Sequence, residues 1–244
     1  YTLSRGLGDV YKRQVLTLTI LPLKSSLASI GEVTQLEGNG VIDRKDGDKG
    51  IVVEKALDVF SYDTVKTGNG KVGIEFIDAT RVDVTQHSKL IIDEFVYDPN
   101  SGTGKLSLKA SLGTVRYASG QIAKNSATNV KITTPTATIG VRGTDFTMTI
   151  DEVGSSTIIL LPSCDTNGNC FVGEISVESD AGQVILNQAF QATVVDTVAS
   201  RPLTPVILDL DEEMIGNLLI ISKPAEIKEM QKTEGLVEVA DALD

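Results

Sequence analysis

Alternation of apolar and polar side chains is the feature that most limits what this chain can fold into. Successive side chains of a β-strand point to opposite faces, so a run with a period of two residues predicts a half-buried strand. Such runs recur between Ile30 and Ser200 with turn residues between them, and a spacing of about 8–12 residues is typical of sandwiches and barrels. No stretch before residue 205 keeps a helical period for three turns. The sequence therefore predicts an all-β domain, built as a multi-stranded sandwich or a flattened β-solenoid. The apolar positions of the runs are Val72, Ile74, Phe76, Val82, Val84, Leu90, Ile92, Leu106, Leu108, Val115, Tyr117, Val130, Ile132, Phe146, Met148, Ile150, Ile175, Val177, Val184, Leu186 and Val194.

Composition agrees with strands and argues against one class of partner. The chain has 244 residues, 22 of them glycine, and no tryptophan. Many glycines and few aromatics suit short strands joined by turns better than helices packed on an aromatic core. The net charge is −11. Nucleic-acid affinity rests on Lys and Arg neutralising phosphates, so we expect no nucleic-acid partner.

The first 28 residues are expected to lie outside the mature protein. Residues 1–14 have no periodicity and resemble adapter-derived translation at the start of a gene fragment. Residues 15–23 form an apolar run that is too short to span a bilayer as a helix. Ser26 and Ala28 follow, and they are the small residues that signal peptidase requires. We interpret residues 1–28 as adapter-like sequence plus the remnant of a secretory signal peptide, which leaves no membrane span in the mature chain. A short buried strand over residues 15–23 is the alternative.

The two cysteines support export. Cys164 and Cys170 enclose five turn-forming residues. In an oxidising compartment such a close pair predicts a local disulfide. The pair has no histidine nearby and lacks the four ligands of a structural zinc site.

The strand-like alternation of the sequence ends at Ser200. Residues 201–208 contain two prolines and read as a linker. Leu210, Met214, Leu218 and Ile221 then recur at helical spacing among many acidic residues. We expect residues 209–244 to form an acidic helical tail, and the absence of a terminal signal after it indicates truncation.

Residues 134–146 form the most specific motif in the chain, two alternating runs around a Gly-Val-Arg-Gly-Thr corner. The motif resembles the signature of the FecR domain family. The residues that carry this resemblance are Thr134, Pro135, Gly140, Arg142, Gly143, Thr144 and Phe146.

Further steps in the same order extend the resemblance over about 150 residues. A departure occurs at Asp78 and Ala79, where relatives usually have Asp-Gly. Because Ala does not easily adopt a positive φ, we expect an ordinary type I turn there. The other matching segments are residues 31–33 with Gly38, 63–68, 72–76, 88–92 and 113–115.

The resemblance implies a FecR-like β domain over residues 29–200, located in the periplasm or at the bacterial cell surface. It implies a non-catalytic exported module that binds a protein partner in the envelope and serves signalling or regulation. A structural or adhesive module of a larger surface protein is the alternative, and an enzyme is the third and least favoured reading. We assign no catalytic residue, no cofactor and no metal site.

Three candidate chemistries have simpler explanations. Arg142 could clamp a carboxylate through its bidentate guanidinium, but we favour a structural role in which it satisfies carbonyl groups at the strand corner. His87 is the only histidine, and with no nucleophile elbow nearby it reads as a solvated turn residue. Calcium could be held by the acidic loops at residues 46–48 and 165–169, although solvated loops are the default expectation.

Overall fold

The computed structural model describes residues 28–45, 47–126, 128–164 and 169–210. Within them the chain forms strands and one helix of five residues, which confirms the all-β class. The helix is α1 (Gln121–Asn125). The strands of the first half are β1 (Gly31–Asp43), β2 (Ile51–Val52), β3 (Asp58–Val59), β4 (Thr64–Phe76), β5 (Arg81–Val84), β6 (Lys89–Asp98) and β7 (Thr103–Ala118). Those of the second half are β8 (Val130–Thr133), β9 (Thr138–Arg142), β10 (Asp145–Ile150), β11 (Ser156–Leu161), β12 (Ser163–Cys164), β13 (Cys170–Phe171), β14 (Glu174–Ser179), β15 (Gly182–Leu186), β16 (Gln191–Val195) and β17 (Val206–Ile207).

Four strands close into a small barrel. β4 pairs with both β5 and β6, and both of these pair with β7. The closure is possible because β4 and β7 are long enough to pair with β6 at one end and with β5 at the other. β1 runs antiparallel along β4 and carries the short strands β2 and β3. Neither a plain sandwich nor a solenoid describes this closed circuit, so the structure refines the architecture predicted from the sequence.

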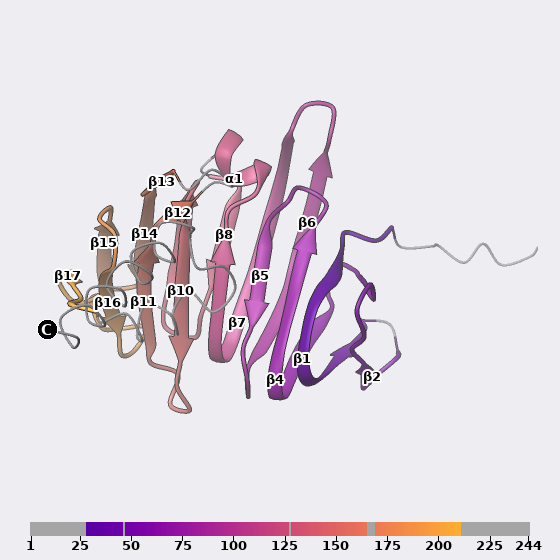
Figure 1. Cartoon of the computed structure of the whole chain (residues 1–244). Coiled ribbons are helices and arrows are strands. Elements are labelled where there is room, and N and C mark those ends of the chain that lie inside the picture. Colours follow the sequence, from indigo (N-terminus) through magenta and orange to yellow (C-terminus); the bar gives the residue numbers. More distant parts are fainter. Residues whose placement is uncertain (1–27, 46, 127, 165–168, 211–244) are drawn as a thin grey trace, which may run out of the picture.

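Two arms extend from β7 on the same side of the barrel (Figure 1). The first arm is β8, β9, β14 and β15, and it begins with a parallel pairing of β7 and β8. The second arm is β10, β11, β16 and β17, and it begins with an antiparallel pairing of β7 and β10. Both arms contribute to one hydrophobic core, with Ile139 and Val177 from the first arm and Met148 and Ile158 from the second.

The predicted alternation positions the core correctly almost everywhere. Every apolar position named from the sequence runs is buried except Val184 and Val194. Two aromatic pairs strengthen the core, with ring centroids 5.2 Å apart for Phe76 and Phe95 and 5.4 Å apart for Tyr117 and Phe146. Full burial of one such side chain is worth about 1.5–3 kcal/mol, so these rows supply most of the favourable free energy of folding.

Two Gly-Asn-Gly triplets lock β1 to β4 where both strands bend. Gly38 lies directly opposite Gly70, and the pairing register shifts just after Gly38. A Cβ atom on Gly38 would overlap the Asn69 carbonyl oxygen, and one on Gly70 would overlap the Glu37 carbonyl oxygen. The two backbones therefore approach more closely than any side chain permits.

The corner at Asp78 and Ala79 differs from the prediction. Ala79 adopts a φ of 63°, so the expected type I turn is wrong. The Asp78 carboxylate stabilises this conformation. Its Oδ1 accepts the Thr80 N–H at 3.0 Å, and its Oδ2 accepts the Ile122 N–H at 3.2 Å. The Gln121 N–H also donates to the Asp78 carbonyl oxygen at 2.8 Å. A buried aspartate thus fixes both the turn and helix α1, which sequence periodicity did not reveal.

Replacing Ala79 by glycine is expected to raise the free energy of unfolding by about 1 kcal/mol, because glycine adopts a positive φ without a steric penalty. Urea denaturation of the variant and the wild type measures the difference. Ala181→Gly at another exposed turn is the control, and there the greater freedom of the unfolded chain should lower stability slightly. A loss of stability in Ala79→Gly would contradict this account.

The structure describes only parts of the segments that were predicted on either side of the β domain. The signal-peptide remnant and its alternative strand lie outside the described residues, as does the acidic tail after Leu210. Asp209 and Leu210, the first two residues of the predicted tail, are not helical. The predicted linker is partly ordered against the domain: the Leu203 N–H donates to the Val194 carbonyl oxygen at 3.0 Å, and β17 pairs with β16.

Candidate functional site

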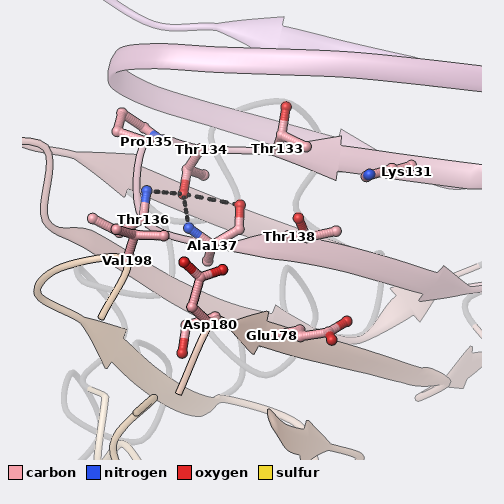
Figure 2. Close-up of a pocket in the computed structure, with 11 residues that line it drawn as sticks. Lys131, Thr133, Thr134, Pro135, Thr136, Ala137, Thr138, Glu178, Asp180 and Val198 are labelled. Atoms are coloured by element: carbon pink, nitrogen blue, oxygen red, sulfur yellow. Dashed lines mark hydrogen bonds between the residues drawn. The ribbon is translucent and has the colours of Figure 1, made fainter. Parts of the chain in front are cut away.

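The motif at residues 134–146 forms a tight turn, strand β9, the corner after it and the start of β10. Thr134 organises the turn between β8 and β9. Its hydroxyl oxygen accepts the N–H of Ala137 at 3.0 Å and that of Thr136 at 3.4 Å (Figure 2). The Thr134 N–H donates to the Ala137 carbonyl oxygen at 2.9 Å. A threonine side chain that bonds its neighbouring backbone in this way replaces the bonds of a regular ladder and fixes the turn.

A chain of buried hydroxyl groups ties this turn to the second arm. Thr136 Oγ1 donates to Ser156 Oγ at 2.7 Å, and Ser156 Oγ donates to Thr134 Oγ1 at 2.8 Å. Ser156 begins β11, so the contact crosses from one arm to the other. Buried hydroxyl groups must find partners, and this arrangement satisfies three of them together.

A cavity of about 350 Å³ lies beside the turn. Figure 2 shows the Asp180 carboxylate directed toward the turn from the β14–β15 side, with Glu178 next to it. Lys131 and Val198 complete the lining with residues 133–138. The volume is at the small end of the range for ligand sites, which starts at about 300 Å³. Hydroxyl groups, two carboxylates and one ammonium group suit recognition of polar groups and side chains.

The corner after β9 carries the chain from one arm to the other. Gly143 has a φ of 58°, a conformation that disfavours any residue with a side chain. Thr144 is fully buried, and its hydroxyl donates to the Leu161 carbonyl oxygen at 3.3 Å and accepts the Gly173 N–H at 3.2 Å. Ser119 Oγ donates to the Thr144 carbonyl oxygen at 2.7 Å. Thr144 therefore holds three segments together at the crossing.

Arg142 does not perform the role predicted for it. Its side chain is 68% exposed and forms an ion pair with Glu174, Nη1 to Oε1, at 3.1 Å. Val141 faces the core and Arg142 faces outward, because neighbouring residues of a strand point to opposite faces. Thr144, rather than Arg142, satisfies polar groups at the corner. An exposed ion pair of this kind contributes little to stability, about 0–1 kcal/mol.

The other family-like segments meet at one point of the barrel. Thr67 of β4 accepts the Ser88 N–H on its Oγ1 at 2.9 Å, and Ser88 Oγ accepts the Thr114 N–H at 3.0 Å. Three motifs far apart in sequence thus join β4, β6 and β7 through hydroxyl groups. Their small polar residues serve packing of the barrel.

Charged groups line the outward face of the barrel next to β10. Asp83 lies directly opposite Arg116, and Arg116 Nη2 is 3.2 Å from Asp145 Oδ2. Burial raises the pKa of Asp83 to about 6, although the charges of Arg116 and Lys71 oppose this rise. Ser163 Oγ donates to Asp145 Oδ1 at 2.6 Å. Asp83 is therefore a buried carboxyl group whose ionised form is disfavoured.

A second buried carboxylate opens the family-like segment at residue 63. Asp63 forms an ion pair with Arg44 and accepts the Phe60 N–H at 2.9 Å. Burial raises the pKa of Asp63 despite these contacts, which lower it. Both contacts engage Oδ2 and fix the entry into β4, while Oδ1 is buried without a hydrogen-bond partner among the described residues.

The remaining candidates of the sequence do not assemble into a reactive site. His87 lies in an exposed turn with a φ of 53°, between β5 and β6. No group of three or more His, Cys, Asp or Glu side chains in the described part of the chain could hold a metal ion, and residue 46 and residues 165–168 of the two acidic loops lie outside it. Cys164 and Cys170 are directly opposite each other in the β12–β13 pairing. No helix of the described residues is long and apolar enough to cross a bilayer.

Comparison with known proteins gives one family. Residues 63–161 match the model of the family described as FecR protein. Two crystal structures of a candidate anti-sigma factor from Parabacteroides distasonis ATCC 8503 are similar at 11% sequence identity, with TM-scores of 0.41 and 0.46. The aligned parts cover 57% of this chain and 57% of the first structure, and 63% of each chain for the second. The chain thus spans about three fifths of the length of these structures. No curated protein matches it.

Proposed function

The chain contains a FecR domain over residues 63–161, and we propose that it is a non-catalytic regulatory module of the bacterial envelope that binds a protein partner. The family match is the observation that carries this proposal. It begins at Asp63 and ends at Leu161, so it includes the closed barrel and the motif turn with its hydroxyl chain. The coincidence of the family signature with the turn supports a contact surface at the cavity beside it.

The chemistry of the cavity favours a protein partner. Glu178 and Asp180 can accept hydrogen bonds from a basic side chain, and Thr133 and Thr138 can bond a peptide backbone. The space suits one or two side chains better than a large cofactor. The lining hydroxyl groups of Thr134 and Thr136 are engaged with each other through Ser156, and such fixed hydroxyl groups are poor nucleophiles without an adjacent base.

We further propose that the module comprises residues 29–200 together with the segment up to β17, and that it acts after export to the periplasm or the cell surface. Residues 201–207 support this extension because they dock on β16. The cysteine pair supports export, because disulfides persist in oxidising compartments.

The binding proposal is tested with the 244-residue chain as bait for bacterial envelope extract. A captured protein is then purified, and its affinity is measured for the wild type and for Asp180→Lys. We expect at least a tenfold loss of affinity in the variant, because a lysine would repel a basic partner group. Glu54→Lys, an exposed acid outside the cavity lining, is the matched control and should bind normally.

Three outcomes would contradict this proposal. Equal binding by Asp180→Lys and the wild type would remove the cavity from the interface. Retention of glycan or matrix material in place of a soluble protein would favour the alternative reading, a structural or adhesive module of a larger surface protein. Turnover of a substrate by the purified chain would favour an enzyme.

A disulfide between Cys164 and Cys170 is expected in the exported protein. Opposite residues on paired antiparallel strands have Cα atoms about 4.5–5.5 Å apart, which is within the range that a disulfide spans. The non-reduced, denatured protein should not react with a thiol reagent, and reduction should raise its mass by two hydrogen atoms. Reaction of two thiols before reduction would contradict the bond. Cys164→Ser should then expose one reactive thiol at Cys170.

A further inference from the structure

We propose that this chain pairs with a second copy of itself through the free edge of β15. β15 is the last strand of the first arm, and in the described part of the chain it pairs only with β14. Its five residues contain no charge and no proline, and its register with β14 is continuous. Natural edge strands are usually protected by charges, proline, bulges or short length. β2, β3 and β17 have two residues each, whereas β15 has none of these protections.

The turn before β15 determines which backbone groups the edge presents. Asp180 and Ala181 connect β14 to β15, with Ser179 opposite Gly182. The residues that flank a two-residue hairpin loop bond to each other, and residues along the strand then alternate between facing the partner strand and facing away. Gln183 and Ile185 therefore direct their N–H and carbonyl groups away from β14. Both side chains are exposed, Ile185 to 40%.

The chain from β15 to β17 is apolar and has little charge, whereas the neighbouring strand and turn carry Glu178, opposite Gln183, and Asp180. Residues 182–208 contain only Asp196 and Arg201 as charged groups, in a chain of net charge −11. Two copies of an acidic protein repel each other, and residues 182–208 themselves add no net charge to the contact. Figure 1 shows β15, β16 and β17 together at one end of the molecule. Exposed apolar side chains of this segment are Ile185, Val198, Leu203, Val206 and Ile207.

A second copy can form hydrogen bonds with the free backbone groups of β15 when the two-fold axis passes through the pairing at Val184. Antiparallel pairing about this residue sets Gln183 of each copy opposite Ile185 of the other, and the outward backbone groups of both residues then bond across the axis. A two-fold contact buries the same surface on both copies and closes after two subunits. The pairing joins the first arms of the two copies into one sheet. The pairing uses the backbone of β15 and not the cavity at residues 133–138, although Asp180 and Val198 of the cavity lining lie beside this edge. The subunit mass and the β15 amides therefore test the dimer, and the affinity of Asp180→Lys for a captured protein tests the proposed function.

The test measures the mass of the purified 244-residue chain by light scattering over a wide range of concentrations. We expect the wild type to rise from 26.0 kDa toward twice that value. Ile185→Lys should weaken the association at least tenfold, since it places two like charges beside the two-fold axis. Val52→Lys on β2 is the matched control, because it changes an apolar side chain that is 66% exposed on another edge strand, and it should dimerise like the wild type.

Hydrogen exchange provides a second measurement that needs no variant. The amides of Gln183 and Ile185 should become protected as the protein concentration rises, while the amides of β2 should not change. A constant monomer mass would overturn the proposal, and so would a dimer that Val52→Lys disrupts and Ile185→Lys does not. Protection of these two amides at monomer mass would also overturn it, because another strand would then occupy the edge. If Ile185→Lys does not fold, Gln183→Lys replaces it.

Discussion

Replacing Gly70 by alanine is expected to destabilise the domain by at least about 3 kcal/mol, near the upper end of the range for single substitutions. The added Cβ would overlap the Glu37 carbonyl oxygen and would lie 2.8 Å from the Gly38 Cα and 2.9 Å from the Asn39 nitrogen. All three atoms belong to the backbone of β1, and they cannot rotate away as a side chain can. β1 would have to separate from β4 at the bend. The midpoint of urea denaturation measures the loss.

Gly140→Ala is the matched control for this prediction. Gly140 also lies within a strand, but the nearest atom to an added Cβ is the Ser176 hydroxyl oxygen at 2.7 Å. A hydroxyl group can rotate to another position, so the cost should stay below about 1 kcal/mol. Equal effects of the two substitutions would show that close backbone approach at the Gly-Asn-Gly triplets is not what requires glycine.

Replacing Asp83 by asparagine is expected to stabilise the protein at neutral pH by about 2–3 kcal/mol. Burial raises the pKa of Asp83 from 3.8 to about 6, and this difference corresponds to about 3 kcal/mol of penalty for the ionised form. The penalty is absent below the unfolded pKa of 3.8, grows as the pH rises toward 6, and is complete above that value. Asparagine carries no charge to desolvate, so the advantage of the variant should appear above pH 6 and vanish near pH 4.

Denaturation of both proteins at pH 4 and at pH 7.5 measures this effect. Asp98→Asn is a control of opposite sign, because hydrogen bonds from Ser101 and the Asn100 N–H lower the pKa of Asp98. The stability that Asp98 contributes is present above its unfolded pKa and is lost as the pH falls. If Asp83→Asn were less stable than the wild type at pH 7.5, the attraction between the charges of Asp83 and Arg116 would outweigh the cost of burial.

Strand positions were predictable because each depends on a local pattern. The alternation of apolar and polar residues identifies nearly every core position. It gives the wrong residue in β16, where two neighbouring residues are both apolar. Val194 was placed on the core face, but Val195 occupies it. A shift of one residue reverses the face of every side chain in a strand, and the pair of valines in β16 cannot show which of them is buried.

Contacts between distant segments could not be predicted in the same way. Ala79 takes a positive φ because Asp78 is bonded to helix α1, more than forty residues later. Arg142 was assigned to the corner because its guanidinium could satisfy freed carbonyl groups, yet Thr144 does so from inside the core. The cavity is likewise lined by segments that are far apart in the chain, since Glu178 and Asp180 follow the turn by about forty residues. Sequence located the motif, and only the sheet pairing shows what surrounds it.

The closed ring of β4, β5, β7 and β6 determines how the domain unfolds. A ring of strands has no terminal strand from which ladder bonds can be lost one after another, so it must open cooperatively, whereas the two arms can fray from β15 and β17. Among the described residues, the strands of both arms pair with the ring only through β7. Any mechanical load that a bound partner places on an arm therefore reaches the hydrogen-bond ladders of the ring through this one strand.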